Sequence, residues 1–150
     1  MRFSGRQIAV DLPTGWEGQL DEGLQLLSDG AQRPTVMHLA NFPLPPGRGD
    51  FGGGAIETMH PGDVLIVLFE YGPESAGQPL FSSQGIPRFV SKGDFSRETL
   101  HNSIPHMSGV QRFFTHAGRA FCLYLVVGSH MDRADVLGQI NSVLASMEIS

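Results

Sequence analysis

The stretch "VQRFFTHAGRAFCLYLVVGS", residues 110–129, decides the fold. Two runs rich in β-branched and aromatic residues flank the tetrapeptide His116-Ala117-Gly118-Arg119. Gly118 can supply the positive φ that a tight turn between two strands requires. The stretch therefore predicts an antiparallel hairpin, and the other elements can be placed around it.

Strand patterns recur upstream of this hairpin. Residues 7–12 alternate well enough for a strand with one apolar face. Residues 64–69 are almost continuously apolar, which is typical of a central strand buried on both faces. Residues 21–34 leave open a single helical turn or an edge strand. Further strands are expected over residues 16–20, 35–42 and 54–59.

The stretch "DRADVLGQINSVLASM", residues 132–147, predicts an amphipathic helix. Asp132 and Asp135 lie near its start, where the helix dipole favours negative charge. A shorter helix is expected over residues 96–102, with Ser96 as its N-cap. The apolar face of the long helix contains Val136, Leu137, Ile140, Val143, Leu144 and Met147.

These elements predict one α+β domain over residues 1–150. Its largely antiparallel sheet has about six or seven strands, and the long C-terminal helix packs on that sheet. A length of 150 residues is typical of one domain that buries a core without disulfides or metals. The only cysteine, Cys122, lies in an apolar run and is expected to be a buried, unreactive thiol.

Charge and hydropathy exclude several classes of partner. The formal charge of −5 argues against binding to a nucleic-acid backbone, which needs a basic face. No apolar run approaches the ~20 residues that a membrane-spanning helix requires. The N-terminal residues lack the apolar stretch of a secretory signal, so we expect a cytoplasmic protein.

A glycine-rich stretch, "PPGRGDFGGGAIETM" at residues 45–59, contains the spacing of a dinucleotide-binding fingerprint and an Arg-Gly-Asp tripeptide. The fingerprint works only where the glycines join a strand to a helix N-terminus, and here a strand is predicted to follow. The tripeptide mediates adhesion only in exported proteins. We therefore expect residues 47–54 to form a loop that presents Arg48 and Asp50 for binding.

A second loop is expected at residues 71–77, after the buried strand. Tyr71 and Glu74 bracket a Gly-Pro turn there, and tyrosine is favoured where a side chain is apolar at one end and hydrated at the other. Arg48, Asp50, Tyr71 and Glu74 are accordingly the predicted binding residues.

Few residues suggest catalysis or metal binding. Glu57 and Glu70 lie on neighbouring predicted strands and could form a carboxylate pair. His101 and His106 could line a pocket, but no accompanying cysteine or carboxylate pattern completes a zinc site. His38 faces away from Met37 and Leu39 in its strand, and we expect it to be a hydrogen-bonded histidine on the sheet face.

Two short motifs resemble the PsbP-like (Mog/PsbP) family. Residues 13–16 match its Pro-x-Gly-Trp opening, and residues 146–149, Ser-Met-Glu-Ile, match the end of its last helix. The whole chain is also similar to a group of small actinobacterial proteins. The family resemblance implies an antiparallel sheet with helices on its faces, used mainly for binding, and no shared catalytic residues.

From these observations we expect a non-enzymatic binding or adaptor module that uses loops 47–54 and 71–77. Its partner would be another protein or a second copy of the chain, and we expect no cofactor and no bound metal. Two alternatives stay open. One is a small-ligand-binding protein or small enzyme with a pocket near one end of the sheet, and the other is a structural subunit of a homo-oligomer.

Overall fold

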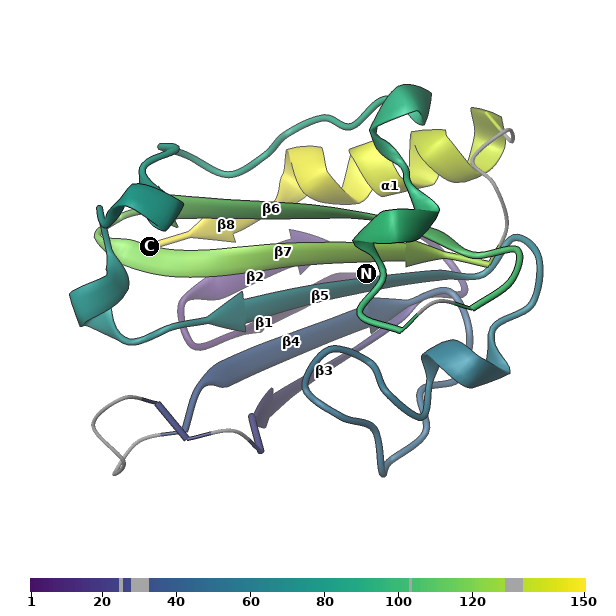
Figure 1. Ribbon diagram of the computed structural model, residues 1–150, viewed down its shortest axis with the longest axis horizontal. Coiled ribbons are helices and arrows are strands. Elements are labelled where there is room, and N and C mark those ends of the chain that lie inside the picture. The colour runs from purple at the N-terminus through teal and green to yellow at the C-terminus, as the bar shows by residue number, and fades with distance from the viewer. Residues whose placement is uncertain (25, 28–32, 103, 129–133) are drawn as a thin grey trace.

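The computed structural model describes residues 1–150 except 25, 28–32, 103 and 129–133. Its centre is a five-stranded antiparallel sheet with the strand order β3-β4-β5-β7-β6 (Figure 1). A smaller antiparallel sheet has the order β1-β2-β8. The strands are β1 (Arg2–Gly5), β2 (Ile8–Asp11), β3 (Glu17–Glu22), β4 (Thr35–Ala40), β5 (Val64–Glu70), β6 (Ser108–His116), β7 (Arg119–Val127) and β8 (Glu148–Ile149).

The predicted hairpin is confirmed as β6 and β7. Their register runs from His116 opposite Arg119 to Ser108 opposite Val127. Both central turn residues have positive φ, 53° at Ala117 and 74° at Gly118. This is the conformation of the tight turn that matches the twist of two antiparallel strands.

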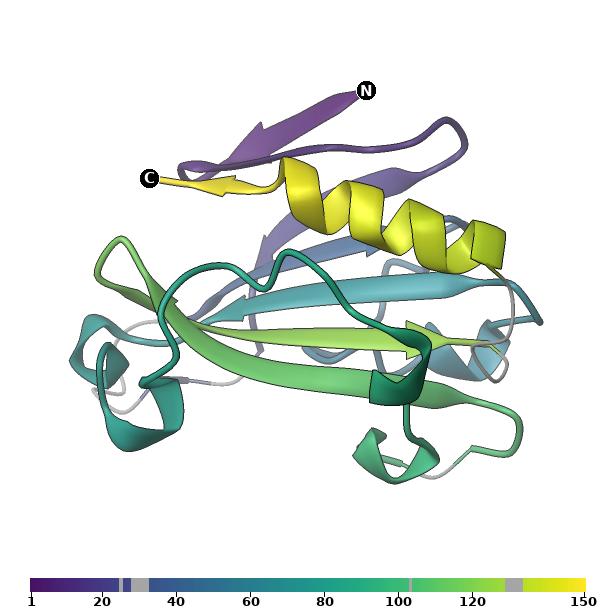
Figure 2. The same ribbon diagram turned by 90° about the horizontal axis from the view of Figure 1, so that it is seen from above.

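One face of the large sheet is covered by α1 (Ala134–Ser146) and by the small sheet, which lie together as a layer above it (Figure 2). Side chains such as Leu68 and Leu123 on this face pack in one core cluster with Ile140 and Leu144 of the helix. The amphipathic helix is thus confirmed and its apolar face is buried. Asp132, predicted to lie near its start, falls outside the described residues.

The other face of the large sheet is covered by irregular connections. Val67, Phe69 and Tyr124 point to this side and pack in a second core cluster that includes Leu44 and Leu100. Short 3-10 helices occur in these connections and in those around β6: η1 (Ile56–Thr58), η2 (Pro73–Ser75), η3 (Pro79–Phe81), η4 (Lys92–Asp94) and η5 (Arg97–Thr99).

The α+β class is confirmed, but one sheet of about six or seven strands is wrong, because the described residues form eight strands in two sheets. Positive φ at Arg6 and Gln7 reverses the chain between β1 and β2. β2 then pairs with β8 from the C-terminus rather than with the large sheet. These three strands therefore form a separate layer beside the helix.

Two further predictions meet different outcomes. Residues 56–58 form the 3-10 helix η1 instead of a strand, because Ala55 and Ile56 both donate backbone hydrogen bonds to the Gly52 carbonyl and tighten the chain into turns. Ser96 does cap a helix, since its Oγ accepts a hydrogen bond from the Glu98 amide, although that helix is a single 3-10 turn.

The burial of the Cys122 thiol and the lengths of the described helices also agree with the sequence-based predictions. Cys122 is fully buried, and burial raises its thiol pKa to about 11. In the described part of the chain, no helix is both long and apolar enough to cross a bilayer.

Candidate functional site

The glycine-rich stretch folds back onto the edge of the large sheet and makes contact with β3 and its end. The Leu44 amide donates to Glu17 Oε1 at 3.4 Å. Arg48 forms an ion pair with Asp21, and the Leu24 amide donates to Asp50 Oδ1 at 2.7 Å. These contacts hold the segment 46–50 across the face of the sheet that carries His38.

The glycines of this stretch allow the chain to turn where it crosses the sheet. Gly52 has a φ of +86°, and a Cβ at this position would collide with the side chain of Leu65 beneath it. The Gly49 amide donates to the Gly53 carbonyl at 2.7 Å, which closes a local turn. The chain then enters η1, a three-residue 3-10 helix, so the fingerprint spacing precedes no long helix that could bind a pyrophosphate.

Arg48 lies inside the molecule rather than at the tip of a loop. The residue is only 8% exposed. One terminal nitrogen pairs with Asp21, and the other donates to the Pro45 carbonyl at 3.0 Å. Its Nε has no hydrogen-bond partner among the residues that the structure describes.

His38 lies at the centre of β4, opposite Gln19 of β3 and Val67 of β5. Residues opposite each other in an antiparallel pair share a face, so His38 faces the same side as Gln19 and Asp21. It does face away from Met37 and Leu39, as predicted. The prediction that it is hydrogen-bonded is wrong within the described residues, where neither ring nitrogen has a partner and the residue is 2% exposed.

A pocket of about 400 Å³ lies between β3, β4 and the segment 46–50. We call it the His38 pocket. Gln19 and Asp21 contribute from β3, Val36 and His38 from β4, and Arg48 and Asp50 from the segment. It lies near the end of the sheet where β3 leads into residues 23–34.

Burial controls the protonation of the histidine in this pocket. Loss of hydration and, second to it, the positive charge of Arg48 lower the pKa of His38 to about 4. The carboxylates of Asp21 and Asp50 oppose this shift, as does the backbone of Gly49, which lies nearby without the geometry of a hydrogen bond. The ring is therefore neutral near pH 7, with one N–H donor and one acceptor.

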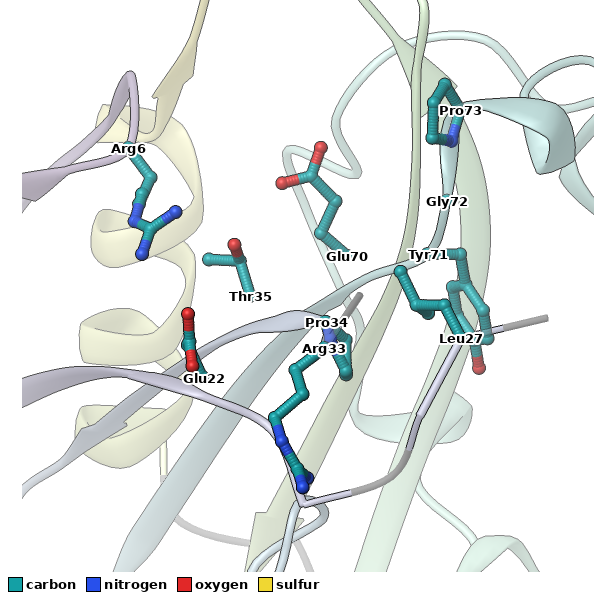
Figure 3. Close-up of a pocket in the computed structure, with 10 residues that line it drawn as sticks. All are labelled: Arg6, Glu22, Leu27, Arg33, Pro34, Thr35, Glu70, Tyr71, Gly72 and Pro73. Atoms are coloured by element: carbon teal, nitrogen blue, oxygen red, sulfur yellow. The ribbon is translucent and has the colours of Figure 1, made fainter. Parts of the chain in front are cut away.

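A second pocket, of about 370 Å³, lies at the same end of the large sheet, around Glu22, Thr35 and Glu70 at the ends of β3, β4 and β5. Figure 3 shows Arg6, Glu22, Thr35 and Glu70 around one part of it, and Leu27 and Tyr71 around the other. Of its charged side chains, Glu22 and Glu70 belong to the large sheet, Arg6 lies in the turn between β1 and β2, and Arg33 precedes β4. Glu22 also lines the His38 pocket, so the two pockets adjoin each other at the end of β3.

The predicted loop at residues 71–77 contributes little that is free to bind. Tyr71 is half-buried, and its ring packs between Phe69 and Phe81 at centroid distances of 4.7 and 5.0 Å. Burial raises its pKa to about 12, so the hydroxyl stays protonated. Glu74 is exposed on η2, and its carboxylate lies against Gly72.

The candidate carboxylate pair does not form. Glu57 is exposed on η1, where it accepts a hydrogen bond from the Gly54 amide. Glu70 ends β5 and makes two hydrogen bonds with Arg119, at 2.7 and 2.8 Å. The two residues line different pockets.

His101 and His106, in the connection 97–107, have different environments. His101 packs its ring on Tyr124 and Phe51, and partial burial lowers its pKa. With Glu57 it lines a small hollow of about 100 Å³. His106 is exposed and has a positive φ of 66°. Within the described residues, no three histidine, cysteine or carboxylate side chains are grouped to hold a metal.

The sequence thus predicted Arg48 and Asp50 as binding residues but did not predict His38 and Asp21 as their neighbours. A histidine at an inward position of an otherwise apolar strand, "TVMHLA", is the one indication that the sequence offered. Comparison with protein families, curated proteins and solved structures finds no match to this chain.

Proposed function

We propose that this chain is a small-ligand-binding protein whose ligand occupies the His38 pocket. The observation that carries the proposal is His38 itself, a buried, neutral imidazole without a hydrogen-bond partner among the described residues, in the wall of a pocket. A buried polar group that lacks a partner costs stability, and such groups persist where binding uses them.

The size and lining of the pocket support this proposal. Small-molecule sites have volumes of roughly 300–1,000 Å³ and a few convergent polar groups. The His38 pocket, at about 400 Å³, combines His38 and Arg48 with the carboxylates of Asp21 and Asp50. The adaptor hypothesis, by contrast, needs Arg48 at the surface, where it is not found.

The same groups favour binding over catalysis. Acid–base catalysis works best when the pKa of the acting group lies near the working pH. The pKa of about 4 makes His38 a weak base near pH 7. The carboxylate of Asp21, which lies closest to Arg48, is held in an ion pair. Each group is therefore suited to hydrogen bonding rather than to proton transfer.

The burial of His38 defines how a ligand reaches it. Asp21 is exposed and Gln19 is half-buried, so these two β3 residues form the rim that a ligand meets first. The nitrogens of His38 and the Nε of Arg48 are buried behind that rim. We therefore expect a ligand to displace the segment 46–50 slightly as it binds.

Backbone amide NMR of the full chain tests the proposal with a set of small neutral, cationic and anionic fragments. We expect at least one fragment to shift the amides of residues 19–21, 36–38 and 47–50 together. His38→Leu should abolish these shifts. The control His60→Leu, in an exposed turn outside the pocket, should keep them. A folded chain in which no fragment moves these amides, or in which His38→Leu binds normally, would contradict the proposal.

A further inference from the structure

We infer that the His38 pocket selects a ligand that carries an uncharged carboxamide, or the equivalent group of a lactam or urea. This inference rests on the proposed function, because it specifies the ligand of that same pocket. It follows from two properties of the lining, its charge and the donors and acceptors that have no partner.

The charge of the lining disfavours anions. Arg48 is the only cation among the described lining residues, which also include the carboxylates of Asp21, Glu22 and Asp50. Arg48 is moreover already paired with Asp21, so its charge is partly neutralised. A carboxylate or phosphate would meet a net negative site without a free cation to compensate for its lost hydration.

The unpartnered atoms disfavour simple cations. Arg48 Nε–H is a donor and needs an acceptor. The neutral imidazole of His38 offers one donor and one acceptor, according to its tautomer. An ammonium or guanidinium group has donors only, so it would leave the Arg48 donor unsatisfied and place a second positive charge beside it.

A carboxamide meets both requirements on adjacent atoms. Its carbonyl oxygen can accept from Arg48 Nε–H, and its NH₂ group can donate to the free imidazole nitrogen of His38 or to Asp21. It carries no charge, so it adds no repulsion in the negative lining. Ketones and esters supply the acceptor but lack the donor, which leaves the imidazole acceptor unpaired.

Three isosteric probes test the inference: benzamide is neutral, benzoate is negative and benzamidine is positive. All have the same planar shape and fit a pocket of about 400 Å³. For fragments of this size we expect a benzamide Kd on the order of millimolar. Titration of the ¹⁵N-labelled full chain should show benzamide shifting the amides of residues 19–21, 36–38 and 47–50. Benzamidine should bind at least about fivefold more weakly, and benzoate should not bind there.

The ring nitrogens of His38 provide a second measurement that does not depend on a variant. Their ¹⁵N shifts should change when benzamide binds, because a hydrogen bond forms to the imidazole. His38→Leu should raise the benzamide Kd at least about tenfold, whereas His60→Leu should leave it unchanged.

The outcomes separate the inference from the proposed function. Benzoate or benzamidine binding at this pocket as tightly as benzamide would overturn the carboxamide inference. Fragments of other chemistry that shift the same amides while benzamide does not would overturn it too, and would leave the proposed function standing. If no compound shifts these amides in the folded chain, both are wrong.

Discussion

His38 links the pocket to the free energy of unfolding. Its imidazole has a pKa of about 4 in the folded chain and is expected to titrate near 6.5 when unfolded. Between these values the unfolded chain binds a proton that the folded chain excludes. Stability contributed in this way is complete above pH 6.5 and is lost as the pH falls toward 4.

We therefore predict that acid destabilises the wild-type chain more than His38→Leu. The shift corresponds to about 3 kcal/mol of unfolding free energy across the window. At pH 7, His38→Leu should equal or exceed the wild-type stability, since leucine fills the site without an unpartnered polar group. Urea unfolding at a series of pH values measures both effects.

The control for this prediction is His60→Leu, a histidine substitution at an exposed position outside the His38 pocket. Two charged residues near the ring act in opposite directions, since Arg48 resists protonation and Asp21 favours it. Parallel pH curves for the wild type and His38→Leu would show that this histidine does not titrate as inferred.

At the scale of elements, α1 is held to the segment 86–91 by side-chain hydrogen bonds. The Val90 amide donates to Asn141 Oδ1 at 2.8 Å, and Asn141 Nδ2 donates to the Val90 carbonyl at 3.0 Å. Arg88 donates to carbonyls in the last turn of the helix and beyond it, at Leu144 and Met147. The bonds from Arg88 satisfy carbonyls at the C-terminal end of the helix that have no partner within it.

We predict that Asn141→Ala lowers the free energy of unfolding by about 2 kcal/mol. The reason is that Val90 is 1% exposed, so both of its backbone groups lose their partner where water cannot easily replace it. Denaturant unfolding checks the value. Ser142→Ala, next to it on the exposed side of the helix, should change stability by less than about 0.5 kcal/mol. Equal effects of the two substitutions would refute the role of Asn141.

Elements with strong local patterns could be predicted from the sequence. The hairpin over β6 and β7 depends on a turn of four residues, and α1 depends on apolar positions three and four residues apart. Residues 56–58 could not, because their alternation resembles a strand while the turn at Gly52 decides their conformation. The burial of Arg48 likewise depends on Asp21, which is 27 residues away in the chain.

At the scale of the molecule, the separate small sheet was the feature hardest to predict. β8 has two residues, too few to show a pattern, and its partner β2 lies near the other end of the chain. Pairing over such a separation is fixed by the packed core, here Ile8, Ile149 and the helix beside the small sheet, rather than by local sequence. For this reason the sequence indicated where strands form, but it did not indicate how those strands divide between two sheets.

The two sheets are joined at one end by Arg119, and this contact supports the last prediction. Its guanidinium binds both carboxylate oxygens of Glu70 in the large sheet and donates to the carbonyls of Arg6 and Ser150 at 3.1 and 3.0 Å. Arg119→Ala should lower the free energy of unfolding by about 2 kcal/mol, because it leaves a largely buried carboxylate unpaired. Amide hydrogen exchange should accelerate in β1, β2 and β8 more than in β5 and β7. Arg112→Ala, which removes a more exposed ion pair with Asp94, is the matched control and should change neither quantity appreciably. A uniform acceleration over both sheets would mean that Arg119 stabilises the fold without joining its layers.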